Sequence, residues 1–186
     1  LLPTGNVRDV VDGIELTAID NGMPVVVMRA ADFGKTGYET PEELEADTDL
    51  KARVEAIRLQ IGPRMNLGDV AKKTVPKMCL IAPPRDGGAV STRNFIPHRV
   101  HEAIGVFGAV SVATACVLPG SVADGVAQVA DPASLDVEHP TGFFTVAMDV
   151  AMEPDGLKVR RAALLRTARR LMRGEVYVRA AVWSGA

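Results

Sequence analysis

Three side chains that bind anions or move protons stand close together, immediately before an uncharged stretch. They are His98, Arg99 and His101, and the run from Ile104 to Leu118 that follows them carries no charged residue. The run predicts a helix, and the first N–H groups of a helix have no partners inside it and carry partial positive charge. A helix start beside arginine and histidine is suited to a carboxylate or a phosphate. The alternative is that the histidines cap turns and that Arg99 is solvated.

Other candidate residues lie near the start of the chain, in the sequence LPTGNV. Thr4, Gly5 and Asn6 are typical of a tight turn that presents a hydroxyl and an amide. Two interpretations stay open, since these residues either line a ligand site or serve only as turn residues. Lysines also cluster before a predicted strand, and we expect them to be solvated: Lys72, Lys73 and Lys77.

Familiar signatures of nucleotide, metal or nucleophile chemistry are missing from the sequence. The glycines of PPRDGG are not followed by the lysine and serine of a P-loop, and the patterns GxSxG, HExxH and GxGxxG do not occur. Cys79 and Cys116 lie in apolar runs without the spacing of a zinc site, so we expect buried structural thiols. The residue types alone therefore leave the catalytic residues unassigned.

Composition limits the class of protein. The 186 residues suffice for one domain with a core, and we expect a single domain over 1–186. A net charge of −2 and an aromatic content of 4% give no sign of a nucleic-acid partner. The apolar run is shorter than the roughly 20 residues that cross a bilayer, so we expect no membrane contact. The two cysteines in apolar runs fit a reducing compartment, so we expect a cytoplasmic location. The chain begins at Leu1 inside a stretch that is predicted to be structured, so we expect it to be part of a longer protein.

The periodicity of apolar residues predicts the elements that position these side chains. A helix is predicted over 40–63, with Thr40 and Glu43 forming a capping box and a possible break within 45–49. Short connections favour antiparallel pairing. The segment 160–170 is compatible with a helix as well, but its β-rich neighbours favour a strand over 157–169. The predicted strands cover 14–20, 24–30, 77–83, 89–96, 134–139, 142–150, 157–169 and 174–183.

The predicted helix over 104–118 is apolar on every side, which requires that other elements surround it. Valine is a poor helix former, so burial by the rest of the fold must keep this segment helical. The simplest arrangement is an α+β fold in which a curved antiparallel β-sheet or barrel is wrapped around one central helix. The helix over 40–63 has a polar side and is expected to pack on the outside.

Four long stretches together resemble one known family, in the same order along the chain. They are LLPTGNVRDVVDGIELTAIDNGMPVVVMRA, TVPKMCLIAPP, TRNFIPHRVHEAIGVFGAVSVATACVLPGS and RRAALLRTARRLMRGEVYV. They resemble the C-terminal half of the methylaconitate isomerase (PrpF-type) family, and within it most closely the 4-oxalomesaconate tautomerases. The resemblance covers essentially the whole chain.

The resemblance implies a diaminopimelate-epimerase-like fold of two similar domains with the active site in the cleft between them. It implies a proton-shifting isomerase or tautomerase of small unsaturated di- or tricarboxylates such as 4-oxalomesaconate, without a cofactor or metal. A methylaconitate-type cis–trans isomerase is the alternative within the family. On this interpretation substrate-binding residues are His98, Arg99, His101, Thr4, Gly5 and Asn6.

The resemblance also implies that the proton-transfer residues, a lysine and a cysteine, lie mainly in an N-terminal domain outside this sequence. The fragment is then either inactive alone or completed by the missing domain or a second copy of the chain. A non-catalytic anion-binding domain and a truncated product without a function of its own remain the other interpretations.

Overall fold

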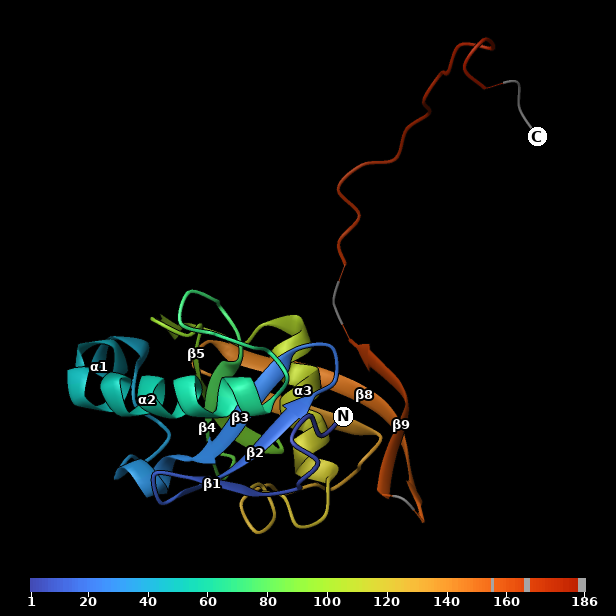
Figure 1. Ribbon diagram of the computed structural model, residues 1–186. Coiled ribbons are helices and arrows are strands. Elements are labelled where there is room, and N and C mark those ends of the chain that lie inside the picture. The colour runs from blue at the N-terminus through green and yellow to red at the C-terminus, as the bar shows by residue number, and fades with distance from the viewer. Residues whose placement is uncertain (155, 166–167, 184–186) are drawn as a thin grey trace.

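The computed structural model describes residues 1–154, 156–165 and 168–183. In this part of the chain a curved nine-stranded sheet lies against one central helix, α3 (Val106–Val117) (Figure 1). The helices α1 (Pro41–Ala46) and α2 (Thr48–Arg64) lie on the other side of the sheet. The strands are β1 (Asp9–Val11), β2 (Ile14–Asp20), β3 (Pro24–Arg29), β4 (Lys77–Ala82), β5 (Val90–Phe95), β6 (Val100–His101), β7 (Ser134–His139), β8 (Gly142–Glu153) and β9 (Gly156–Leu164).

Two hydrophobic cores lie on the two faces of this sheet, because successive side chains of a strand point to opposite faces. Val25 and Cys79 face α3, whereas their neighbours Val26 and Met78 face α2. Ile14, Leu16 and Ala18 of β2 also share the α2 face, as the sequence predicts. Both faces of the central strands are therefore covered, which explains their nearly continuous apolar sequences.

The middle of helix α3 is enclosed as predicted, whereas its first turn is not, since Phe107 is exposed. Every residue from Ala109 to Ala115 is buried, and this part of the helix packs against side chains of β2, β3, β7 and β8. The helix begins at Val106, two positions later than the apolar run, and Gly105 is its N-cap. The prediction of one apolar helix surrounded by a curved sheet is confirmed.

The sheet is mixed and open, not an antiparallel barrel. Its order is β1-β2-β3-β4-β5-β7-β8-β9, with β6 paired to β5, and the pairs β3–β4 and β5–β7 are parallel. A parallel pair needs a long crossover connection, usually through a helix. The β3–β4 crossover contains α1 and α2, and the β5–β7 crossover contains α3. The predicted antiparallel pattern therefore fails where a helix lies between two strands.

The outer helix is divided at the predicted position. Thr40 caps α1, and its hydroxyl and the carboxylate of Glu43 form the predicted capping box. Asp47 ends α1 and caps α2 by accepting a hydrogen bond from the N–H of Leu50. The buried face of α2 is the predicted one: Leu50, Val54, Ile57 and Ile61.

The end of the chain differs from the prediction. The predicted strand over 157–169 is confirmed as far as Leu164, and positions 166 and 167 lie outside the described residues. The predicted strand over 174–183 was wrong, because this segment runs away from the body of the molecule and meets no sheet edge with which to pair (Figure 1). Among the described residues, no helix has the length and apolar character needed to cross a membrane.

Candidate functional site

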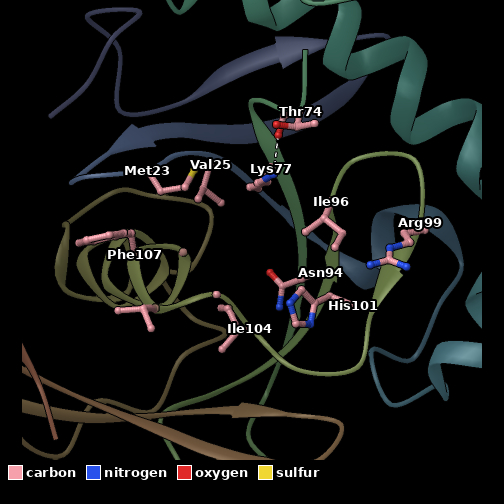
Figure 2. Close-up of a pocket in the computed structure, with 13 residues that line it drawn as sticks. Met23, Val25, Thr74, Lys77, Asn94, Ile96, Arg99, His101, Ile104 and Phe107 are labelled. Atoms are coloured by element: carbon pink, nitrogen blue, oxygen red, sulfur yellow. Dashed lines mark hydrogen bonds between the residues drawn. The ribbon is translucent and has the colours of Figure 1, made fainter. Parts of the chain in front are cut away.

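A cavity of about 450 Å³ opens at the N-terminus of α3 (Figure 2). One side is apolar, and the other carries the side chains of Lys77, Asn94, Arg99 and His101. No aspartate or glutamate is among the described residues that line it. The lining of the cavity therefore presents cations and hydrogen-bond donors without an acidic side chain, although Arg99 also borders a neighbouring hollow that Glu42, Glu45 and Glu102 line. Its apolar side is formed by Met23, Val25, Ile96, Ile104, Val106 and Phe107.

The first turn of α3 contributes backbone donors to the cavity. Gly105 provides no side-chain cap, and the first hydrogen bond of the helix runs from the N–H of Ala109 to the carbonyl of Gly105 at 2.8 Å. The N–H groups at positions 106–108 therefore have no partner within the helix. They add to the positive end of the helix dipole, which favours a negatively charged group in the cavity.

Lys77 is the site residue that the sequence did not indicate. It begins β4, lies half-buried in the cavity wall, and its Nζ donates to the carbonyl of Thr74 at 2.6 Å. Burial, reinforced by the charge of Arg58, holds the pKa of the Lys77 amine below its usual value. The prediction of a solvated lysine run was wrong for Lys77 and right for Lys72 and Lys73, which are exposed.

Arg58 of α2 holds the segment that leads into Lys77. Its guanidinium is fully buried and donates to the carbonyls of Val70 and Val75, both at 2.9 Å. Glu55 balances its charge through two hydrogen bonds of 2.7 Å. Since both carbonyls precede β4, these contacts fix the chain just before Lys77 and so position its amine.

His101 and Asn94 face each other across the β5–β6 pair. The Nδ1 of His101 accepts a hydrogen bond of 2.9 Å from the N–H of Ala103, so in the neutral ring the proton is on Nε2. His101 is thereby arranged to donate a hydrogen bond. Asn94 is 5% exposed, and its amide nitrogen donates to the hydroxyl of Thr92, which leaves its oxygen without a partner among the described residues.

The structure separates the three residues that precede the helix. Arg99 and His101 line the cavity, and the exposed side chain of Arg99 has no hydrogen bond or ion pair among the described residues. Its charge acts on Glu45, whose pKa is lowered mainly by Lys51 and in part by Arg99. His98 lies outside the cavity, with its Nδ1 4.0 Å from Oε2 of Glu55. Two members of the predicted group therefore line the cavity, with Arg99 at the end away from α3 (Figure 2).

The turn at the start of the chain lies elsewhere. Thr4 and Asn6 donate side-chain hydrogen bonds to the buried carboxylate of Asp9, at 2.6 and 3.0 Å, and Arg64 of α2 pairs with the same carboxylate. Gly5 takes the left-handed backbone conformation of a tight turn, with φ of 81°. None of the three lines the cavity, and their assignment to substrate stays a prediction.

Cys79 is buried in the core around α3, as predicted, whereas Cys116 is partly buried and packs against that core. Burial raises the pKa of the Cys79 thiol far above its ordinary range and raises that of Cys116 to about 12. Both thiols are therefore protonated at neutral pH and are poor nucleophiles. Within the described residues, no group of three or more His, Cys, Asp or Glu side chains is arranged to hold a metal ion.

Residues 1–179 match the family model described as PrpF protein. The chain belongs to the PrpF family. It is 59% identical over its whole length to a 4-oxalomesaconate tautomerase of Pseudomonas putida, and 60% identical over 96% of its length to a (4E)-oxalomesaconate Δ-isomerase of a Novosphingobium species. These matches cover 51% and 50% of those enzymes, so the chain spans about half the length of the curated relatives it matches.

A solved PrpF relative has the same fold. The crystal structure of a methylitaconate Δ-isomerase superimposes with a TM-score of 0.81 over 97% of this chain and 52% of that one, at 25% sequence identity. The predicted α+β, diaminopimelate-epimerase-like fold is therefore confirmed. The PrpF relatives with known names are isomerases and tautomerases, which agrees with the family implied by the sequence.

Proposed function

We propose that this chain forms one wall of the active site of an isomerase or tautomerase that shifts a proton in a small unsaturated di- or tricarboxylate such as 4-oxalomesaconate. The observation that carries the proposal is the cavity at the N-terminus of α3, which combines Lys77, Arg99, His101 and free N–H groups without an acidic side chain. The names of the most similar relatives support this substrate class, because 59–60% identity to 4-oxalomesaconate enzymes exceeds the 28% to a 2-methyl-aconitate isomerase.

The groups in the cavity match the needs of a proton shift. Removing a proton from a carbon next to a carbonyl or carboxylate leaves an enolate, which donors must stabilise until the proton returns to another atom. Arg99 is placed to bind a substrate carboxylate, and the Nε2–H of His101 and the N–H groups of α3 are placed to donate to the enolate oxygen. Lys77 is the proton carrier on this wall, because a lowered pKa increases the neutral, basic fraction of its amine.

The second wall comes from outside this chain in the proposal, either from the other half of a longer protein or from a second copy. Phe107, in the first turn of α3, is 57% exposed at the rim of the cavity. A large apolar side chain beside an anion-binding cavity is unfavourable in water and favourable under a covering surface. Closure would also exclude water and strengthen the electrostatic contacts inside.

The first test is an ultraviolet assay of keto–enol conversion of 4-oxalomesaconate, corrected for the spontaneous rate, with this chain alone. We expect Lys77→Met to lower catalysis by at least about 100-fold, the usual contribution of a general acid or base. Arg99→Ala is expected to weaken carboxylate binding about tenfold. Lys73→Met is the matched control, because Lys73 also donates to one backbone carbonyl but is exposed and lies outside the cavity.

Calorimetric titration with a saturated tricarboxylate, which cannot tautomerise, separates binding from turnover. Binding that depends on Arg99, together with absent catalysis, would mean that the proton-transfer groups of the missing wall are required or that the domain only binds anions. Catalysis that survives in Lys77→Met would remove Lys77 from the mechanism. An unchanged affinity in Arg99→Ala would refute the assignment of the cavity.

A further inference from the structure

A second, smaller cavity of about 230 Å³ lies on the opposite face of β5. The first cavity takes Asn94 and Ile96 from this strand segment, and the second takes Ser91 and Arg93, which point the other way because side chains alternate along a strand. We call it the Arg93 cavity. Its other lining residues are Tyr38, Thr40, Pro41, Arg85, Asp86, Glu138, His139 and Pro140.

Arg93 has hydrogen-bond donors that no described residue uses. The side chain is 7% exposed, and three of its five N–H groups are engaged: Nε donates to the carbonyl of Glu39 at 2.6 Å, and Nη1 donates to the carbonyl of Thr92 at 2.8 Å and to the hydroxyl of Ser91 at 3.5 Å. Nη2 has no partner in the described part of the chain. No fully buried side-chain nitrogen or oxygen there lacks a partner, so Nη2 is accessible to solvent, and Arg93 is one of the residues that line the cavity.

The charge of Arg93 is also unpaired at close range. No ion pair within 4.0 Å is found for its guanidinium among the described residues. Burial disfavours the cation and lowers the pKa of Arg93, and the charges of Glu39 and Glu138 offset this only in part. The carboxylate of Glu39 accepts hydrogen bonds from the N–H groups of Thr36 and Gly37. A second cation stands at the rim, where the guanidinium of Arg85 lies over the ring of Tyr38 at 5.7 Å from its centre. A buried cation with two free donors calls for an acceptor of negative charge.

The acidic residues of the cavity do not supply that acceptor. The carboxylate of Glu138 accepts three backbone hydrogen bonds, each of 2.8 Å, from the N–H groups of Arg85, Asp86 and Gly88. It is thereby committed to the loop over 85–88, and Asp86 itself is exposed to solvent. His139 adds no fixed charge, because burial holds its pKa below the usual value.

We propose that the Arg93 cavity binds a small carboxylate, whose oxygens accept hydrogen bonds from Nη2 of Arg93 and from the guanidinium of Arg85. The volume equals roughly seven or eight water molecules at about 30 Å³ each, which suits an anion of two to four carbons. The site is separate from the proposed active site, since the sheet lies between them.

The test is a titration of the ¹⁵N-labelled chain with malonate, followed by amide chemical shifts, with sodium phosphate and with sodium chloride at equal ionic strength as parallel arms. We expect saturable shifts in the amides of Arg85, Asp86 and Gly88 with malonate. Arg85→Gln is expected to weaken malonate binding about two- to fivefold. Arg53→Gln is the matched control with unchanged affinity, because Arg53 also lies over a ring, that of Phe33, but on α2.

Arg93→Lys keeps the charge and removes the fork of donors, so we expect about a tenfold loss of affinity. Arg93→Lys also loses three native hydrogen bonds and could fail to fold. The comparison of Arg85→Gln with the parent chain tests the proposal in that case as well. Equal shifts with chloride or phosphate would overturn the proposal, as would an unchanged affinity in Arg85→Gln. Shifts confined to positions 105–108 would also overturn it, because malonate would then occupy only the first cavity.

Discussion

Lys77 is expected to titrate below the ordinary lysine value of about 10.4. Its amine is half-buried, and burial and the charge of Arg58 both disfavour the protonated form. The measurement is reductive ¹³C-methylation of the chain followed by an NMR pH titration, with the Lys77 resonance assigned by its absence in Lys77→Met. A midpoint at or above the ordinary value would contradict the proposed role of this amine as a base.

The same shift sets the pH dependence of stability. Because the folded pKa of Lys77 lies below the unfolded pKa, the folded protein binds fewer protons between the two values and stability rises with pH across that window. The contribution is lost as the pH falls through the folded pKa. Lys77→Met should therefore be at least as stable as the parent chain near neutral pH, which separates loss of catalysis from loss of fold.

At the level of single residues, the local sequence indicates which side chains can bind an anion or move a proton, but it does not indicate which of them come together in the fold. The sequence predicts a site at Arg99 and His101 because they directly precede the apolar helix, and both line the cavity there. Lys77 was missed because its place in the cavity depends on the β3–β4 and β4–β5 pairings and on Arg58, all of which are distant in sequence. The free donors of Arg93 were equally invisible, since they follow from which carbonyls happen to lie near the guanidinium.

Among the elements, α3 gives the sharpest prediction. Val110→Asp places a carboxylate inside the enclosing sheet. An unpaired buried charge costs more than the 5–15 kcal/mol by which a domain is typically stable. If the carboxylate takes up a proton instead, burying the neutral group still costs several kcal/mol. We expect loss of the cooperative urea transition, followed by circular dichroism. Phe107→Asp on the same helix should remain folded, because position 107 is exposed and lies in the first turn, where a negative charge suits the dipole. A Val110→Asp variant with the parent midpoint would refute the enclosure of α3.

The pattern of elements was predictable where one segment carried the whole signal. The uncharged run identified α3, and the Thr40–Glu43 pair identified the start of α1. Strand direction was not predictable in this way. The strands β3 and β4 are neighbours in the sheet, but α1 and α2 lie between them along the chain. The alternation of a strand shows which face is buried, whereas its partner depends on the path of the crossover.

On the scale of the whole molecule, the segment over 168–183 stands apart from the rest (Figure 1). The hydrogen bonds found for it join residues within the segment, such as Val182 and Trp183 to the carbonyl of Arg179. Its large apolar side chains are strongly exposed: Leu171, Met172, Val176, Tyr177, Val182 and Trp183. The strand predicted for 174–183 rested on the β-branched and aromatic residues of this segment. Such residues indicate a preference for strand structure, but they do not show whether the chain supplies a partner strand.

Such a segment should mediate association, because contiguous exposed apolar surface is unfavourable in water and marks interaction sites. We expect the chain to self-associate with rising concentration in sedimentation velocity runs, and a chain that ends at residue 167 to do so markedly less. The truncation should shift the melting temperature by less than about 2 °C, the effect of roughly 0.5 kcal/mol in a chain of this size, since the segment does not pack on the body. Tyr177→Ser is the point variant that distinguishes apolar contact from chain length. A truncated chain that sediments like the parent would exclude this segment as the association surface, and a truncated chain that melts much earlier would show that the segment supports the fold itself.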